Sequence, residues 1–339
     1  MMQQLPPRVS IGLPVYNGEN YLALAIDSLL GQSYQDFELI VSDNASTDRT
    51  EAICRAYAAR DARIRYCRET ENRGAAWNFN RLVGLAQGEY FKWAAHDDLC
   101  APEWLARCVD VLDRDSSVVL CFTKHAPIDA EGRPFKATRR DAGERAPKRE
   151  FDASQPHRRY RDVLVHCDWC YEMFGLARTR LMRRTGLQRA YFGGDKMLLA
   201  ELSLLGRFEE VPEILFYPRQ HAGQSSAIPT VVEQQRYVNP AARRRFSCPG
   251  MLRFNWGYFL LAVGSPLSFA ERGRCLCALA GYLLRPDKWR RLLRKGGRAL
   301  GFGGPKPLHP ALVRAAETHG PAPAAPWQSS AGDRSWERV

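Results

Sequence analysis

The sequence predicts an α/β fold in which a mainly parallel sheet is flanked by helices. Over residues 1–122, short apolar runs rich in β-branched residues alternate with stretches whose apolar side chains recur at helical spacing. Each helical stretch is long enough to cross over between parallel strands, and such crossovers are right-handed. The notable polar side chains each follow a strand-like run, at the end of a parallel sheet where ligands bind.

The individual elements follow in order along the chain. Strands are expected at residues 9–13, 38–41, 64–67, 90–95 and 118–122. Helices are expected from Tyr21 to Leu30, from Thr47 onward, over residues 77–86, and from Pro102, which suits a first helical turn.

The later part of the chain is expected to divide by composition. Residues 123–160 are rich in Arg, Lys, Asp and Pro and predict a long surface excursion, after which structured patterns resume to about residue 221. The expected divisions are a folded domain over 1–225 with halves 1–122 and 123–225, a basic helical extension over 226–300, and a disordered tail over 301–339, where Gly, Pro and Ala accumulate.

Composition and charge narrow the class of protein. Of 339 residues, 45% are hydrophobic and 25% charged, which excludes collagen-like, wholly disordered and many-spanning membrane proteins. Residues 1–235 carry 31 Lys and Arg against 32 Asp and Glu, whereas residues 236–339 carry 18 against 5. The basic last third is expected near an anionic membrane surface. Nucleic acid is not expected, because no zinc-finger, basic-region or RNA-binding-sheet signature is present.

Two segments of the last third of the chain are candidates for contact with a membrane. Residues 255–270 are uncharged but shorter than a span of about 20 residues, so they predict a buried helix or a shallow membrane-surface helix. Residues 285–298 mix apolar and basic side chains, as in an interfacial helix or a solvated basic helix packed on the core. Residues 1–8 lack the apolar region of a signal peptide. We therefore expect a cytoplasmic protein, peripheral on the inner face of the membrane.

The cysteines are expected to be small buried hydrophobes of a reduced protein. Ten are scattered along the chain, and Cys167 and Cys170 are the one pair at metal or redox spacing. A zinc site needs a second such pair, so no function is assigned to these two thiols.

Adjacent carboxylates, Asp97 and Asp98, follow the fourth predicted strand. At 4 Å two such charges repel by about 1 kcal/mol in water and by several-fold more in a partly dry site. A divalent cation would offset this repulsion, and hard oxygen ligands suit Mg²⁺ or Mn²⁺ shared with phosphates. The alternative is a solvated Asp-Asp turn that caps the helix beginning at Pro102.

Polar and aromatic side chains also follow the earlier strands. Asp43 could accept hydrogen bonds from a base or ribose, or cap a helix. Tyr16 offers a flat face for a nucleobase, or is a core aromatic. Arg73 could bind a base, a phosphate or a surface acid.

In their order and spacing, these motifs resemble the family 2 glycosyltransferases. The matching motifs are Pro14-Val15-Tyr16-Asn17, Ser42 to Asp48, Asn72-Arg73-Gly74, and Gly88-Glu89-Tyr90 leading to His96-Asp97-Asp98. The resemblance implies a GT-A fold with a Rossmann-like nucleotide-binding half, a nucleotide-diphosphate sugar donor, and Mg²⁺ or Mn²⁺. It assigns donor binding to Pro14, Tyr16, Asn17, Asp43, Arg73 and Asp97, and metal binding to Asp98 with Asp97.

The chain departs from the family pattern at Ala95, where many members carry Asp. A metal site with fewer carboxylates binds the ion more weakly without the donor diphosphate. We therefore expect metal and donor to bind cooperatively.

The resemblance also assigns the general base to Asp195. This residue follows Phe192-Gly193-Gly194 and precedes an apolar helical run. An ordinary aspartate, with a pKa near 3.9, is ionised at neutral pH and can accept the proton of an attacking hydroxyl, whereas a purely structural Asp195 would be a helix cap. Pro218-Arg219-Gln220-His221 resembles the closing segment of the family, which places His221 near the phosphates or the metal; a structural histidine is the alternative.

The predicted function is an inverting glycosyltransferase that moves a sugar to a hydroxyl of a glycan or lipid-linked acceptor, in cell-surface polysaccharide or glycolipid synthesis. One alternative is a sugar-nucleotide nucleotidyltransferase, which would want a Gly-rich basic loop in place of Pro14 to Gly18. Another is a non-catalytic member that only binds nucleotide sugar, which Ala95 favours. A dehydrogenase is not expected, because no GxGxxG follows the first strand.

Overall fold

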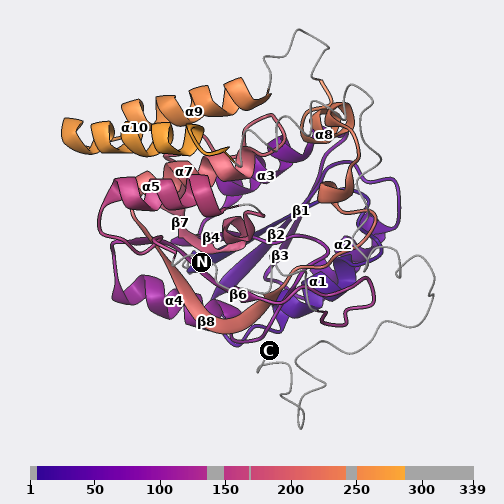
Figure 1. The fold of residues 1–339 in the computed structure, drawn as a ribbon. Coiled ribbons are helices and arrows are strands. Elements are labelled where there is room, and N and C mark those ends of the chain that lie inside the picture. Colours follow the sequence, from indigo (N-terminus) through magenta and orange to yellow (C-terminus); the bar gives the residue numbers. More distant parts are fainter. Residues whose placement is uncertain (1–5, 136–148, 168, 242–249, 287–339) are drawn as a thin grey trace.

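One eight-stranded sheet forms the centre of the computed structural model, which describes residues 6–135, 149–167, 169–241 and 250–286 (Figure 1). The strand order is β3-β2-β1-β4-β7-β6-β8-β5. The strands are β1 (Val9–Val15), β2 (Phe37–Asp43), β3 (Ile64–Arg68), β4 (Tyr90–Trp93), β5 (Leu99–Cys100), β6 (Val118–His125), β7 (Leu176–Arg178) and β8 (Arg207–Tyr217).

Helices cover both faces of this sheet. The helices are α1 (Leu22–Leu30), α2 (Thr50–Ala58), α3 (Ala75–Leu85), α4 (Trp104–Arg114), α5 (Pro156–His166), α6 (Thr179–Met182), α7 (Gly194–Leu205), α8 (Val231–Val238), α9 (Gly250–Gly264) and α10 (Phe269–Leu283), with short 3₁₀ turns η1 (Tyr171–Phe174) and η2 (Ser225–Ala227). Apolar side chains of α1, α2 and α4 form the core on one face, and those of α3, α5, α7, α9 and α10 form the core on the other.

The sheet is mainly parallel, which confirms the predicted fold class. Strands β3, β2, β1 and β4 are parallel neighbours, and β6 is parallel to β8. Strand β7 is antiparallel to both β4 and β6, so it joins two groups of strands that run in the same direction. The carboxyl ends of β1, β2, β3, β4, β6 and β8 therefore lie together, and we call this side of the molecule the carboxyl end of the sheet.

The second predicted helix begins later than expected, at Thr50 rather than Thr47. The backbone N–H of Thr47 donates instead to Asn17 Oδ1 (2.8 Å), across to the loop after β1. Asp48 Oδ1 accepts from the N–H of Thr50 (3.0 Å) and so marks the true start of the helix. Contacts between loops thus outweigh the helical pattern here.

The chain after β6 is only partly the surface excursion that was predicted. Strand β6 itself continues to His125, and the following residues pair with the chain after β8. The N–H of Ile128 donates to Pro218 O (3.0 Å), and the N–H of Gln220 donates to Ile128 O (2.8 Å). Residues 136–148 lie outside the described residues, and α5 follows at Pro156.

The uncharged segment 255–270 contains the second half of α9 and the start of α10, which are separated around Pro266. Helix α9 packs one face on α7 and leaves the other exposed, so it is neither fully buried nor free of the core. In the described part of the chain, no helix is both long and apolar enough to cross a bilayer. Most of the predicted amphipathic segment 285–298 and the whole predicted tail 301–339 lie outside the described residues.

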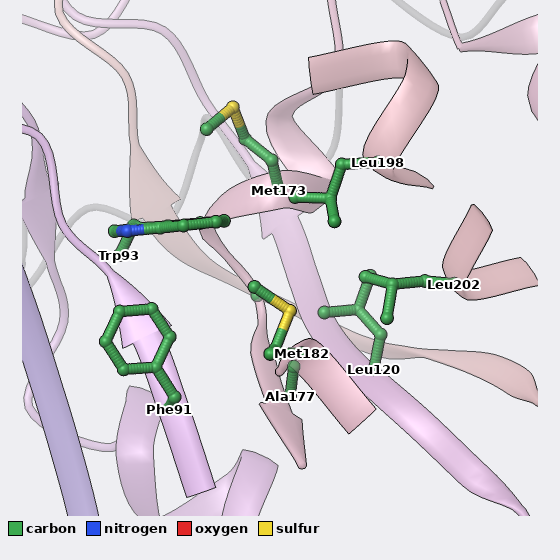
Figure 2. A pocket seen from close by; sticks show the side chains of 9 residues that line it. Phe91, Trp93, Leu120, Met173, Ala177, Met182, Leu198 and Leu202 are labelled. Carbon is green, nitrogen blue, oxygen red and sulfur yellow. The ribbon is translucent and has the colours of Figure 1, made fainter. Parts of the chain in front are cut away.

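The core beneath α7 is tightly filled. Figure 2 shows apolar side chains from the sheet, η1 and α7 meeting around a small space. This space, beside Trp93, Met182 and Leu198, has no room for a water molecule. It is therefore a packing gap and not a ligand site.

We predict that Gly12→Ala destabilises the protein. A Cβ on Gly12, in the middle of β1, would lie 2.9 Å from both Leu82 Cβ and Phe91 Cζ, so the packing of α3 on the sheet must shift, at a cost of about 1–3 kcal/mol. Gly84→Ala is the matched control, because a Cβ there meets nothing within 4 Å and alanine favours the helix by up to about 1 kcal/mol. Thermal denaturation should show opposite signs for the two variants; equal melting temperatures would contradict the packing described.

Candidate active site

The loops after β1 and β2 are tied together at the carboxyl end of the sheet. Register places Pro14 beside Ser42 within the sheet. Asn17, with a φ of 51°, donates its N–H to Ser46 Oγ (2.9 Å) and accepts from Thr47 with its side-chain oxygen. Asn17 thus holds the two loops in place, whereas the ring of Tyr16 is 43% exposed beside them.

Asp43, the last residue of β2, is fully buried and uses both carboxylate oxygens within the protein. Oδ1 accepts from the N–H of Ser46 (2.8 Å), and Oδ2 accepts from the hydroxyl of Tyr66 (2.7 Å). Arg68 Nε lies 3.4 Å from Oδ2. A base or ribose that hydrogen-bonds to Asp43 would therefore bind an oxygen that already accepts a hydrogen bond from Ser46 or Tyr66.

Arg73 lies on the loop after β3 and presents its guanidinium at the surface. The side chain is 46% exposed and stacks 4.3 Å from the ring centroid of Trp77. Its backbone N–H donates to Asn44 Oδ1 (3.0 Å), which fixes this loop to the loop after β2. The following Gly74 has a φ of +88°, and a Cβ there would lie 2.4 Å from Val238 O at the end of α8. Only glycine lets α8 approach so closely.

The two adjacent carboxylates lie between the ends of β4 and β8. Asp97 Oδ2 is 2.9 Å from Nε2 of His221, and Asp98 Oδ1 accepts from the backbone N–H of Arg219 (2.8 Å). The guanidinium of Arg219 donates to the carbonyl oxygens of Asp97 (2.9 Å), Asp129 (3.1 Å) and Ala130 (3.0 Å). Arg219 therefore joins the Asp97 loop, the chain after β6 and the end of β8.

The two carboxylates differ in acidity because their surroundings differ. Burial and the neighbouring charge of Asp97 hold the pKa of Asp98 well above its usual value. Burial acts on Asp97 as well, but His96 and His221 outweigh it and lower the pKa of Asp97.

Lys92 and Arg219 were not predicted as site residues, although both act on the carboxylate pair. Lys92 is buried in β4, where Nζ donates to Phe174 O (3.1 Å) and lies 3.9 Å from a ring centroid of Trp104. The positive charges of both residues favour ionisation of Asp98. A lysine inside an apolar strand, just before two aspartates, is the signal that could have identified Lys92.

Asp195 lies in the first turn of α7, after Gly193 in the left-handed region (φ +89°). Its Oδ1 accepts from the N–H of Lys196 (2.9 Å). Burial raises the pKa of the Asp195 carboxyl, while hydrogen bonds from Lys196 and from the thiol of Cys170 limit that rise. The predicted base is therefore a half-buried carboxylate with two donors beside it.

The predicted residues gather at the carboxyl end of the sheet. Helix α7 leads directly into the start of β8, so its first turn, with Asp195, returns to the end where β8 finishes. A Cβ on Gly18 would lie 2.7 Å from His96 Cδ2, so the loop after β1 contacts the loop of the carboxylate pair. Gln220 Nε2 donates to the hydroxyl of Tyr171 (3.1 Å). Tyr171 follows Cys170 in the sequence, and the Cys170 thiol lies beside Asp195. The chain after β8 is thereby linked to the first turn of α7.

The side chains proposed as metal ligands do not form a ready-made cage. Among the residues that the structure describes, no three His, Cys, Asp or Glu side chains are arranged to hold a metal. His221 instead contacts Asp97 on one side and lies 4.8 Å, between ring centroids, from Tyr21 on another. The second oxygens of Asp97 and Asp98 remain outside the contacts described above.

Comparison with known families identifies the class of protein that this fold and site define. The family described as glycosyl transferase family 2 matches residues 10–188, more than half of the chain, so the chain belongs to that family. The predicted resemblance is thus confirmed. An uncharacterized glycosyltransferase of Rickettsia typhi is 35% identical over 149 residues, which are 44% of this chain and 45% of that protein. Chondroitin synthase of Escherichia coli is 32% identical over 126 residues, 37% of this chain and 18% of that enzyme.

These matches span less than half of either relative. Among solved structures, residues 1–349 of S. aureus TarS in complex with UDP-GlcNAc superpose with a TM-score of 0.56 and 19% identity, covering 81% of this chain and 71% of that one. This likeness shows the shared fold, which is of the GT-A type.

We predict that Arg219→Met destabilises the protein by about 3 kcal/mol or more, because it removes a buried guanidinium and leaves three partly buried carbonyl oxygens without their charged donor. Arg133→Met is the control from the same region: its side chain is 61% exposed and its ion pairs are worth about 1 kcal/mol or less. Urea denaturation measures both variants. Similar losses for the two would show that Arg219 does not join these segments.

Proposed function

We propose that the chain is an inverting glycosyltransferase that moves a sugar from a nucleotide-diphosphate sugar to a hydroxyl of a glycan or lipid-linked acceptor. The observation that carries this proposal is the gathering of Asp97, Asp98 and Asp195 at one end of the sheet in a family 2 domain. TarS, which shares the fold, was solved with UDP-GlcNAc, and this supports a nucleotide-sugar donor. A role in cell-surface polysaccharide or glycolipid synthesis belongs to the same proposal.

The donor is proposed to bind on the loops of residues 1–122. The exposed ring of Tyr16 is placed to stack on the base, and the exposed guanidinium of Arg73 to bind a phosphate or the base. Pro14, Asn17 and Asp43 act through the loops that they hold, with Asp43 close to the base or ribose. Residues 123–225 are proposed to form the acceptor half.

A divalent cation fits the carboxylate pair. Each of Asp97 and Asp98 has one oxygen outside the contacts with His221 and Arg219, and two carboxylate ligands suit Mg²⁺ or Mn²⁺ that also binds waters and phosphate oxygens. When bound, such an ion supplies positive charge that stabilises the diphosphate. His221, which contacts Asp97, is proposed to orient that carboxylate beside the ion.

Asp195 is proposed to act as the general base. Its ionised carboxylate takes the proton of the acceptor hydroxyl while the oxygen attacks the anomeric carbon and the bond to the diphosphate breaks. Attack from the side opposite the diphosphate inverts the anomeric centre. Because burial raises the pKa of Asp195, its carboxylate is a stronger base than an exposed aspartate.

Asp195→Asn should reduce turnover by about 10²-fold or more, the usual contribution of general-base catalysis, while leaving donor binding nearly intact. Asp152→Asn, an exposed carboxylate before α5, is the control and should keep full turnover. Transfer assays with a panel of nucleotide sugars measure the first effect and donor-induced thermal shifts the second. Near-full turnover of the Asn variant would show that Asp195 is not the base.

The rate should also fall on the acid side of the pH profile. The base works only when ionised, and burial raises the pKa of Asp195, so kcat/KM should decline as pH falls, at a pH above the ordinary aspartate value of about 3.9. The measurement is kcat/KM against pH at saturating Mn²⁺. A profile that stays flat down to that value would contradict the assignment.

Asp98→Ala should abolish the effect of metal on donor binding. In the wild type, UDP and GDP are expected to raise the melting temperature more with Mn²⁺ than without, because metal and diphosphate bind together. Asp110→Ala, an exposed carboxylate on α4, should behave like the wild type. A nucleotide shift that is the same in Asp98→Ala and the wild type, with and without Mn²⁺, would remove Asp98 from the metal site.

A further inference from the structure

The outer face of α9 carries large apolar side chains that are exposed in the described part of the chain. Trp256 is 62% exposed and Leu260 50% exposed. The other exposed members of this face are Leu252, Phe259 and Val263. Their spacing of three and four residues places all five on one side of the helix, and we call this set the α9 outer face. A contiguous apolar patch of this kind marks an interaction surface, unlike scattered exposed residues.

Helices α9 and α10 form a further layer outside α5 and α7, at the periphery of the molecule (Figure 1). The rings of Trp256 and Phe259 stack with centroids 5.2 Å apart, so these two exposed side chains form one continuous aromatic surface. Phe269, the first residue of α10, is a further exposed apolar side chain of these two helices (89% exposed).

The surroundings of this face are positively charged. Residues 255–270 carry no charge, and the described residues 250–286 contain four arginines against one acid, Glu271. Glu271 is already paired with His157 (2.9 Å) and Arg274 (2.5 Å). A groove of about 630 Å³ between α5 and α10 is lined by basic side chains and no acidic one; they are His157, Arg161, His166, Arg274 and Arg285. Arg161 is paired with Glu150 (2.6 Å) and His166 lies 3.8 Å from Asp162, so the net positive charge of this layer comes from the excess of arginines in residues 250–286.

Charge distinguishes the candidate occupants. A symmetric contact with a second copy would bring the net positive charge of α9 and α10 against the same charge of the other copy, because the same patch meets itself. Residues 287–339 carry ten Lys and Arg against four Asp and Glu, so this segment does not complement that charge either. An anionic bilayer supplies both an apolar interior for the aromatic side chains and phosphates for the arginines.

We propose that the α9 outer face docks on the surface of an anionic membrane, with the apolar side chains in the outer part of the bilayer and the arginines at the phosphates. The opposite face of α9 covers the start of α7. A Cβ on Gly193 would lie 2.9 Å from Phe254 Cζ, and one on Gly257 would lie 2.5 Å from Met197 Cε. Only the width of one helix, about 10 Å, separates the docking face from the loop of Asp195.

This geometry favours a lipid-linked acceptor over a soluble glycan. A docked molecule holds the first turn of α7 close to the membrane surface, where the sugar of a lipid-linked acceptor would lie. This step rests on the proposed function, whereas the docking itself does not.

The test measures how much of the full chain floats with lipid vesicles. One set of vesicles is phosphatidylcholine alone, and the other contains about 30% phosphatidylglycerol, which is anionic. The wild type is expected on the anionic vesicles, and Trp256→Gln/Leu260→Gln should bind them at least about tenfold more weakly. Val231→Gln/Val232→Gln is the matched control, because it removes two exposed apolar side chains from α8, and should bind like the wild type. Arg274→Gln should weaken binding to the vesicles that contain phosphatidylglycerol and should not change binding to phosphatidylcholine alone.

A photo-crosslinking amino acid in place of Leu260 identifies the occupant directly, and lipid adducts are expected. Three outcomes would overturn the proposal. They are crosslinks to a second copy or to residues 287–339, a wild-type chain that does not float with anionic vesicles, and a Trp256→Gln/Leu260→Gln variant that floats as well as the wild type. Donor-induced thermal shifts of the α9 variant should match the wild type, which shows that it is folded with an intact donor site. Loss of sugar transfer in Asp195→Asn, with flotation unchanged, keeps the two proposals separate.

Discussion

The repulsion between Asp97 and Asp98 is the constraint on which this end of the molecule depends. At a separation of about 4 Å, two like charges repel by about 1 kcal/mol in water and by more where water is partly excluded. The chain answers with four cationic or ionisable partners from three places in the sequence: Lys92 in β4, His96 directly before the pair, and Arg219 and His221 after β8. The pair is therefore held in place before any metal or diphosphate binds, and the remaining charge attracts a cation.

This arrangement makes the two halves of the domain depend on each other. Arg219 follows Asp98 by 121 residues, yet it supplies the N–H that binds Asp98 and the guanidinium that binds Asp97 O. Strand β7 joins the sheet of the first half to β6 and β8. The carboxylates of the first half thus reach their final environment only when the second half has folded beside them.

Local patterns were sufficient to predict much of the fold, and contacts between distant residues explain what was not predicted. Strands β1 to β4 and helices α1, α3 and α4 follow from periodicity, because each buries a regular apolar face. Strands β5 and β7, of two and three residues, carry no period that could be recognised. The same holds for the site: Asp97, Asp98 and Asp195 follow strands or begin helices, whereas the role of Arg219 depends on partners more than 100 residues away in the sequence.

The cysteine pair shows how such a distant contact changes the interpretation of a motif. The hydrogen bond with Cys167 and burial hold the pKa of Cys170 well above its usual value, so the thiol keeps its proton at neutral pH. A protonated thiol is a poor metal ligand or nucleophile, but it can donate a hydrogen bond. The thiol of Cys170 lies beside Asp195 and favours its ionised form, against the burial that disfavours it. The proposed base can thus be both half-buried and charged, and a charged carboxylate is what proton abstraction from a hydroxyl requires.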